Sequence, residues 1–426
     1  MVFTVAVAKT REWNGRKAGQ ELGLKLTSHL PREPTFVIVY ATIQYEKYGG
    51  FQEFLQGLHE YIPKGTPLIG GTVAAFMTHE GVFSRGAAAV AVYSNEMDVA
   101  AGCGLNTRRN PILAGRECIS QMKQKISESV YPNGFLFVYY SSAVVPSYPF
   151  IGRKAVITSK ILGFLSKALY DFSLKFLQKG VDRSDEFLPL FADEFHDYQI
   201  LAGGCTDDVK QTRNYVFFGN RVLENAVVGL ALKTSLSGGV AATSGFKPTG
   251  KEFQLTKLGQ DRRIIFEIGG EPAKKAFLKI LGWPEAYLDD RVFSRLFWYP
   301  VSFQSRFGRN TMQVFGLFVE DSIIMPYRVE GDKLQLLTAT GKSLLEAASE
   351  NLNYFHDKKP LLGIISECGL RAITLGSRLH DQRETVSEIF GGTPFVSAFF
   401  AGEAIYSQVD GLSYGNDTFK SLLFWR

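Results

Sequence analysis

Cysteine is scarce in this sequence, and no two cysteines form a CxxC pair. The 426 residues contain four cysteines, Cys103, Cys118, Cys205 and Cys368, which are scattered along the chain. Disulfide frameworks and structural zinc sites need closely spaced cysteines, so this pattern disfavours both. Reduced thiols are typical of cytosolic proteins, and we therefore expect a cytoplasmic location.

Long apolar runs are also lacking. No stretch approaches the roughly 20 apolar residues that a membrane-spanning helix requires. The first residues, MVFTVAVAKTREW, place a short apolar run before Lys9 and Arg11, which is the reverse of the order in a secretory signal peptide. We therefore expect neither a transmembrane segment nor a signal peptide.

Charge of one sign is not concentrated anywhere. Lys and Arg number 47 against 42 Asp and Glu, a net charge of +5, and no block of five like charges occurs. Basic blocks are the usual electrostatic mark of nucleic-acid binding, so we expect no nucleic-acid partner. The length and the 45% hydrophobic content indicate two or three globular domains with substantial cores.

Familiar catalytic motifs are absent as well. The sequence contains no GxSxG, HExxH, P-loop or dinucleotide-binding glycine pattern. Ser28 and His29 are adjacent, but adjacency does not place a base against a nucleophile. We therefore expect no enzymatic activity; a Cys368 nucleophile with an unassigned histidine base is the enzymatic alternative.

Three apolar runs each end in a pair of small residues. They are PLIGGTVAAF at 67–76, ILAGGCTDDV at 200–209 and AFFAGEAIYS at 398–407. A strand-like run and a helix-like run precede each one, and another strand-like run follows. The order strand, helix, strand, turn, strand therefore occurs three times, which predicts an internal repeat.

The last strands of the first two copies indicate the fold class. Residues 86–94 and 224–232 are apolar at consecutive positions, which is typical of strands buried on both faces. We therefore predict an α/β protein with layered mixed β-sheets and outer helices. A doubly wound parallel sheet is the alternative, which is less favoured because the turns after the glycines resemble hairpin connections.

Residues 151–182 interrupt the second copy. Apolar residues recur there at helical spacing, which predicts an amphipathic helix that packs Ile161, Leu165, Leu169 and Phe172 against the core or a second copy of the chain. The alternative is a helix that binds a partner protein or a membrane surface, which would make the chain an interaction module.

A further segment, 237–282, separates the second and third copies. It predicts two short strands joined by the polar turn KLGQDRR, followed by a helix that begins near Pro272. Ser and Gly concentrate at 233–240, so we place a domain boundary there.

The order of several short motifs resembles the FIST family. The N-terminal motifs are LIGGT, LAGGCTDD and NAVVGLAL. The C-terminal ones are GFKPTGKEFQLTK, IFEIGGEPAKKAF, FGRN, MPYRVEGDKLQLL, ISECGLR and FFAGEAIYS followed by GNDTF. The resemblance covers roughly residues 30–425 and implies a FIST N-terminal module at 1–233 and a FIST C-terminal module at 234–426.

This resemblance implies an intracellular sensory protein that binds a small ligand and signals to another protein. For the family, amino-acid-like molecules are a leading suggestion for that ligand. Relatives often carry a signalling or F-box domain, and this chain resembles a stand-alone FIST protein. Val73 and Ala74 stand where the family tends to have polar residues, which puts the chemistry of the first copy in doubt.

Some relatives are thought to be haem-based gas sensors, which leaves a haem ligand as an alternative for one histidine. The histidines are His29, His59, His79, His196, His356 and His380.

Polar residues just beyond glycine-rich strand ends point into the crevice where α/β proteins often bind ligands. The residues in this position, with the glycines that admit close approach, are Gly203, Gly204, Cys205, Thr206, Asp207, Gly402 and Glu403. The alternative is that they form tight turns with solvated polar side chains.

SECGLR at 366–371 adds two candidates. Arg371 can clamp a carboxylate, and Cys368 either contacts the ligand or packs as a small apolar residue. Arg309 in FGRN is a second candidate cation. We expect Arg371, Cys368, Glu403 and Asp207 to converge on one cleft between the modules. Since a buried unpaired arginine is costly, we expect Arg371 to be paired with a carboxylate or hydrated when that cleft is empty.

Overall fold

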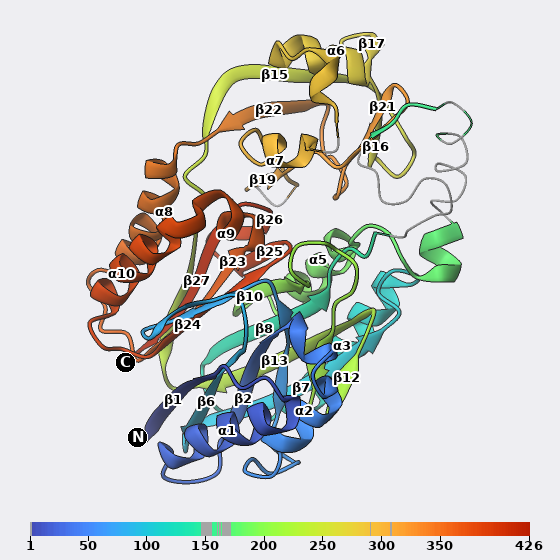
Figure 1. Ribbon diagram of the computed structural model, residues 1–426. Helices are drawn as coiled ribbons and strands as arrows, with labels where there is room; N and C mark the ends of the chain where they lie inside the picture. Colours follow the sequence, from blue (N-terminus) through green and yellow to red (C-terminus); the bar gives the residue numbers. More distant parts are fainter. Residues whose placement is uncertain are drawn as a thin grey trace.

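The computed structural model describes residues 2–145, 156–159, 161, 163, 172–289, 291–306 and 309–426. Its elements repeat three times in the order strand, helix, strand, helix, strand, hairpin, strand (Figure 1). The first copy consists of β1 (Phe3–Thr10), α1 (Gly15–Ser28), β2 (Phe36–Thr42), α2 (Gly50–Leu58), β3 (Leu68–Val73), the hairpin β4 (Phe76–Thr78) and β5 (Gly81–Phe83), and β6 (Ala87–Ser94).

The second and third copies follow the same order. The second contains β7 (Met97–Leu105), α3 (Pro111–Ile126), β8 (Asn133–Ser141), α5 (Ser184–Glu194), β10 (Tyr198–Cys205), the hairpin β11 (Val216–Phe218) and β12 (Arg221–Leu223), and β13 (Ala226–Thr234). The third contains β14 (Ser237–Thr243), α8 (Gly341–Asn353), β23 (Leu362–Cys368), α9 (Gly369–Leu375), α10 (Leu379–Phe390), β24 (Phe395–Phe400), the hairpin β25 (Glu403–Ser407) and β26 (Gly411–Gly415), and β27 (Phe419–Trp425). The sequence pattern thus found the repeat but missed the strand and helix that open each copy.

Each copy builds one sheet with the same topology. The strand orders are β1-β6-β2-β3, β7-β13-β8-β10 and β14-β27-β23-β24. In every case the second and third strands of the copy are parallel, and the last strand lies antiparallel between the first and the second.

The hairpins join the three sheets by a cyclic exchange. The β4–β5 hairpin of the first copy pairs with β24, the β11–β12 hairpin of the second pairs with β3, and the β25–β26 hairpin of the third pairs with β10. Each hairpin therefore leaves its own copy and extends the sheet of another. This exchange makes the three copies interdependent and brings their strand ends together.

One core lies between the three sheets. It contains side chains from every sheet, among them Ile38, Phe137, Leu230, Ile364 and Leu422. Helices cover the outer faces: α1 and α2 on the first sheet, α3 and α5 on the second, and α8 and α10 on the third (Figure 1).

The layered α/β fold class expected from the sequence is thereby confirmed. In β6, Val90 faces the shared core and Ala89 faces the helices, and both are fully buried. Leu230 and Ala231 of β13 show the same division. The prediction that these two strands are buried on both faces is confirmed.

A smaller domain is inserted between β14 and α8, at the top of the view in Figure 1. Its elements are β15 (Lys247–Leu258), β16 (Ile264–Ile268), β17 (Glu271–Pro272), α6 (Ala273–Leu281), α7 (Val292–Leu296), β18 (Val301–Gln304), β19 (Asn310–Gln313), β20 (Leu317–Val319), β21 (Ser322–Ile324) and β22 (Lys333–Thr338). It has its own core around Phe253 and Phe277. The strand pair and helix predicted within 237–282 are present. The boundary at 233/234 stays a prediction.

The amphipathic helix predicted for 151–182 is present only in part: Ile161, Gly163 and Phe172 are helical, whereas residues 156–157 form a strand. β9 (Val156–Ile157) pairs with β20 in parallel and so extends the sheet of the inserted domain. Both residues are β-branched, which favours a strand over a helix at this point. Ser173–Leu177 form a short π-helical turn. Ile161 is 75% exposed and Phe172 is 47% exposed, so neither side chain is buried in a core.

Leu165 and Leu169 lie outside the described residues. Within the described part of the chain, no helix combines the length and apolarity needed to cross a bilayer.

Candidate functional site

Five polar side chains meet where the strands of the third copy end. Cys368 closes β23, Glu403 opens β25, and Asp417, Thr418 and Lys420 lie at the start of β27. We call this group the central polar site. All five residues are buried, with Thr418 the most exposed at 8%.

Hydrogen bonds connect most of these groups. The Glu403 carboxylate accepts from the Thr418 hydroxyl at 2.8 Å and from the Gly402 N–H at 3.1 Å. The Lys420 ammonium donates to the carbonyl oxygens of Glu403 at 2.7 Å and Ser413 at 3.0 Å. The Cys368 thiol also lies in hydrogen-bonding contact with the Glu403 carboxylate.

Asp417 is the exception in this network. It is 1% exposed, and among the described residues neither carboxylate oxygen has a hydrogen-bond partner. Burial raises the pKa of Asp417 from 3.8 to about 7, although the charge of Arg371 opposes this rise. The site therefore contains a buried acceptor that lacks a donor, and such groups are rare in folded proteins.

Burial also perturbs the other titratable groups. It raises the pKa of Glu403 to about 8, against the opposing effect of the Lys420 charge. It lowers the pKa of Lys420 to about 7. Burial, followed by the negative charges of Glu403 and Asp417, raises the pKa of the Cys368 thiol well above its usual value. Three groups thus titrate near neutral pH, which is typical of functional sites.

Gly402 positions Glu403 by a conformation that favours glycine. Its φ is +96°, and a Cβ there would lie 2.1 Å from the Tyr327 hydroxyl and 3.4 Å from that of Tyr140. The Tyr140 hydroxyl donates to the Gly402 carbonyl at 3.2 Å. Tyr140 comes from β8 and Tyr327 from the inserted domain, so three parts of the chain meet at this turn.

Gly203 and Gly204 allow β10 to cross the turn before β25. A Cβ on Gly203 would lie 2.7 Å from the Phe400 ring, and one on Gly204 would lie 2.5 Å from the Ala401 carbonyl oxygen. The Gly204 N–H donates to the Gly402 carbonyl, and the Gly204 carbonyl accepts from the Ala401 N–H, both at 2.8 Å. The structure therefore assigns these glycines close backbone packing beside the central polar site.

Cys205 and Thr206 lie against the first copy. The Cys205 sulfur would be 2.4 Å from a Cβ on Gly71, and its carbonyl accepts hydrogen bonds from the main chain and side chain of Ser142. The Thr206 N–H donates to the Thr72 carbonyl at 2.9 Å. Its hydroxyl is buried without a partner among the described residues.

Asp207 organises the loop of residues 207–213, which we call the Asp207 loop. Its carboxylate accepts from the N–H of Gln211 at 2.8 Å, and from the N–H and hydroxyl of Thr212, both at 2.7 Å. A Cβ on Gly369 would lie 3.4 Å from the Val209 side chain. The loop therefore contacts Gly369, the residue that follows Cys368.

Arg371 borders the site but is committed to other contacts. It is fully buried and forms a 3.3 Å ion pair with Glu367. It also donates to Gln382 and to the carbonyls of Ser244 and Leu344. The expectation that a buried Arg371 is paired with a carboxylate is confirmed. Its charge still reaches Asp417.

Arg309 is held by an ion pair with Asp410 and by a 2.8 Å hydrogen bond to the Asp410 carbonyl. Its charge contributes to the lowered pKa of Lys420.

The four residues expected to converge on one cleft are therefore brought together only in part. Cys368 and Glu403 are in contact, Arg371 acts on Asp417 from the border of the site, and Asp207 belongs to the loop that contacts Gly369. Sequence reasoning missed Asp417, Thr418 and Lys420. Their signal was the GNDTFK segment at 415–420, whose charged residues follow a strand end.

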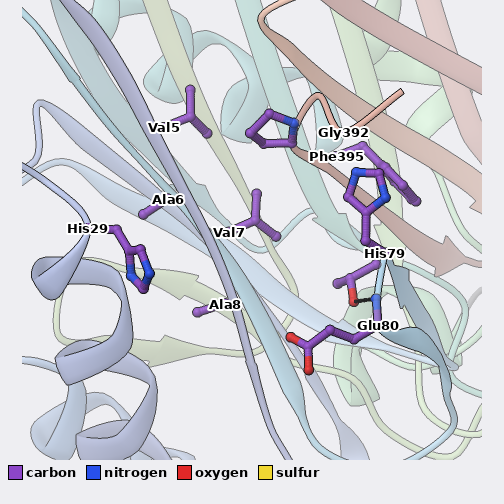
Figure 2. Close-up of a pocket in the computed structure, with 11 residues that line it drawn as sticks. Val5, Ala6, Val7, Ala8, His29, His79, Glu80, Gly392 and Phe395 are labelled. Atoms are coloured by element: carbon purple, nitrogen blue, oxygen red, sulfur yellow. Dashed lines mark hydrogen bonds between the residues drawn. The ribbon is translucent and has the colours of Figure 1, made fainter. Parts of the chain in front are cut away.

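Two surface cavities lie apart from the central polar site. One, of about 400 Å³, is bounded on one side by the Asp207 loop. The other, of about 240 Å³, follows β1 at Val5–Ala8 and reaches His29, His79 and Phe395. Figure 2 shows His29 and His79 on opposite sides of β1. His79 is engaged, since its Nε2 lies 2.8 Å from the Thr393 carbonyl oxygen.

Within the described residues, no group of three or more His, Cys, Asp or Glu side chains is arranged to hold a metal ion.

The fold and the buried polar site define an α/β protein whose strand ends meet at one polar centre. The family model of the FIST N domain matches residues 35–271, which is more than half of the chain. The chain therefore belongs to the FIST family, a family of sensory domains.

No curated protein matches the chain. A solved structure, that of a cyanuric acid hydrolase from A. caulinodans, is similar to it with a TM-score of 0.33 and 7% identity, and the match covers 99% of both chains. Likeness at that level carries no inference about activity.

Proposed function

We propose that this protein is a sensor that binds a small ligand carrying a protonated amine, of the amino-acid class, at the central polar site. The observation that carries the proposal is the Asp417 carboxylate, which is buried with both oxygens unpartnered among the described residues. An ammonium group on a ligand would supply the missing donors and the missing positive charge.

The charge balance of the site supports the same ligand class. The Lys420 charge acts on Glu403 and the Arg371 charge acts on Asp417, yet neither cation donates to either carboxylate, and burial raises the pKa of both carboxyl groups. A bound cation would stabilise the ionised carboxylates and lower those pKa values. Lys420 uses two N–H groups on carbonyls, so its third is available to the carboxylate of an amino acid.

Movement of the Asp207 loop would let a ligand enter the central polar site and would signal that the ligand is bound. The members of the central polar site are buried, so a ligand can reach them only if a covering segment moves. Three hydrogen bonds to the Asp207 carboxylate hold the loop, together with a 2.8 Å hydrogen bond from the Val145 N–H to the Gln211 carbonyl and the ion pair of Arg213 with Glu46. We propose that its displacement admits the ligand, and that the loop conformation is read by a signalling protein.

A binding role is favoured over catalysis by the state of Cys368. A thiolate is the reactive form of cysteine, and burial beside Glu403 and Asp417 raises the pKa of this thiol. Cys368 is thus suited to packing and to hydrogen bonding with Glu403 rather than to nucleophilic attack.

Thermal unfolding with matched ligand pairs tests the proposal. At pH 8, amino acids are compared with the corresponding acids that lack the amine. A ligand at a hundredfold excess over its Kd stabilises the native state by about 2.7 kcal/mol, which raises Tm by several degrees.

Asp417→Asn is expected to abolish the shift, and Asp208→Asn, which removes an exposed carboxylate of the Asp207 loop, serves as the control. Stabilisation by the amine-free acids alone, or an undiminished shift in Asp417→Asn, would contradict the proposal.

A second candidate function rests on the segment at 151–182. Ile161, Phe172 and Phe176 are exposed to 75%, 47% and 69%. Phe172 and Phe176 stack on each other at 5.0 Å instead of entering a core. These exposed apolar groups favour the alternative in which the segment contacts a second copy of the chain or a partner, as tested below.

A further inference from the structure

A second pocket lies on the outer side of the Asp207 loop. It has a volume of about 400 Å³ and is formed by the ends of β1 and β2, the turn before β6, and the loop itself. We call it the Trp13 pocket, after the aromatic residue in its wall. The central polar site contributes no residue to its lining.

The pocket has an aromatic wall that the fold leaves open. Trp13 is 50% exposed and Tyr48 is 47% exposed, and their rings meet edge to face at 5.0 Å. Both residues line the pocket. Large rings that remain half exposed in a concave site are typical of surfaces that stack or bury a ligand.

The acidic residues of the pocket already have partners. Glu46 pairs with Arg213 and accepts from the Tyr215 hydroxyl at 2.8 Å. Asp208 pairs with Lys210, and Asp207 is used within its loop. None of these carboxylates remains available to neutralise another cation in the lining.

Two cationic side chains in the lining have no carboxylate partner among the described residues. Among the described residues, Lys47 and Arg85 form no ion pair with a carboxylate. The Arg85 guanidinium lies 5.1 Å from the Trp13 ring, where it stacks and still presents its N–H groups. An arginine held over an indole, next to a lysine, provides a site for an anionic group beside an aromatic surface.

We propose that the Trp13 pocket binds a small planar aromatic molecule that carries a carboxylate or a phosphate. The ring would contact Trp13 and Tyr48, and the anion would pair with Arg85 and Lys47. This ligand is opposite in charge to the one assigned to the central polar site, and the pocket is open without movement of the Asp207 loop. The proposal therefore does not depend on the proposed function.

The ligand would also contact the Asp207 loop, because Thr212 and Arg213 belong to the lining. Binding at the Trp13 pocket is thus expected to hold the loop in its covering position. It would then slow both entry and release of a ligand at the central polar site, and this step, unlike binding at the Trp13 pocket itself, rests on the proposed function.

Isothermal titration of the full chain with four probes tests the inference. Adenosine 5′-monophosphate and benzoate supply a phosphate and a carboxylate on an aromatic ring, and adenosine and benzyl alcohol are their uncharged counterparts. Binding of at least one anion, about tenfold tighter than its uncharged counterpart, is the expected result. The two anions distinguish a phosphate site from a carboxylate site.

Arg85→Gln and Lys47→Gln are each expected to weaken binding of that anion by about tenfold. Lys342→Gln, which removes an exposed lysine elsewhere, is the matched control and should bind as the unmodified chain does. Asp417→Asn should also retain binding, which separates this site from the central one. Equal affinity for charged and uncharged probes, no binding of either anion, or full affinity in Arg85→Gln, would overturn the proposal.

Discussion

The Lys420 ammonium binds the main-chain carbonyl of Glu403 at 2.7 Å and not the carboxylate of the same residue. The carboxylate is instead held by Thr418 and by the Gly402 N–H. The buried amine therefore fixes the position of the β25 strand and leaves the charge of Glu403 only partly compensated. Burial prevails at both groups, since the pKa of Glu403 rises to about 8 and that of Lys420 falls to about 7.

Replacement of Asp417 by Asn is expected to stabilise the ligand-free protein at pH 8. The pKa of this carboxyl is raised from 3.8 to about 7 in the folded state. Below pH 3.8 both states are protonated and the residue imposes no penalty. Between pH 4 and 7 ionisation increasingly favours the unfolded state, and above pH 7 the full penalty applies.

The increase in the free energy of unfolding caused by Asp417→Asn should therefore be near zero at pH 4 and reach at most about 4 kcal/mol at pH 8. Urea unfolding of both proteins at pH 4, 6 and 8 measures it. Equal stability of the two proteins across that range would show that Asp417 is not buried as an unpartnered acid.

Gly402→Ala is expected to destabilise the fold by about 2 kcal/mol or more, because its φ of +96° strains any L-residue and the new methyl would meet the Tyr327 hydroxyl at 2.1 Å. The double variant Gly402→Ala/Tyr327→Phe separates the two causes. Removing the hydroxyl should recover the steric part and leave the strain of the backbone. Denaturant unfolding of the four proteins of this cycle gives the coupling, and strict additivity would argue against the contact.

Much of the fold could be predicted from periodicity, because consecutive apolar positions and glycine pairs are local features. The three repeats and the double burial of β6 and β13 followed from them. The exchange of hairpins could not be predicted in this way. Pairing of Phe76 with Ala398 depends on which copy lies opposite in space, and each hairpin has a similar sequence pattern.

The site residues show the same limit. Cys368 and Glu403 were found because they follow apolar strands. Asp417 and Lys420 were missed because charged residues after a strand are usually solvated, whereas both are buried here and Lys420 contacts Glu403 and Ser413, which are distant from it only in the sequence pattern and not in space. The packing predicted for Ile161 and Phe172 was wrong because apolar spacing alone does not distinguish a packed helix face from an exposed one.

Phe172→Ser/Phe176→Ser tests whether the exposed apolar segment forms contacts between copies. Analytical ultracentrifugation of the full chain across a range of concentrations is the measurement. If the chain self-associates through this segment, the double variant should sediment as a monomer where the unmodified protein does not. Leu24→Ser, which removes an apolar side chain that is 52% exposed on α1, is the control. Unchanged association in the double variant would exclude the segment as the dimer contact.

The last prediction concerns the Asp207 loop. Asp207→Ala removes the acceptor of three hydrogen bonds that hold residues 207–213, while the strands on either side keep their pairing. Val209 and Gln211 have φ values of +66° and +52°, a conformation that non-glycine residues adopt at a cost. Without the carboxylate, the loop should leave this conformation. Trypsin cleavage after Lys210 is therefore expected to accelerate at least tenfold, with little change in global stability. Asp208→Ala removes only a salt bridge to the side chain of Lys210, and trypsin should cleave this variant at nearly the unmodified rate.

If the loop is the entry route to the central polar site, Asp207→Ala should also speed both association and release of the amine ligand. Faster cleavage with unchanged ligand kinetics would retain the structural role of Asp207 and remove the loop from the entry route.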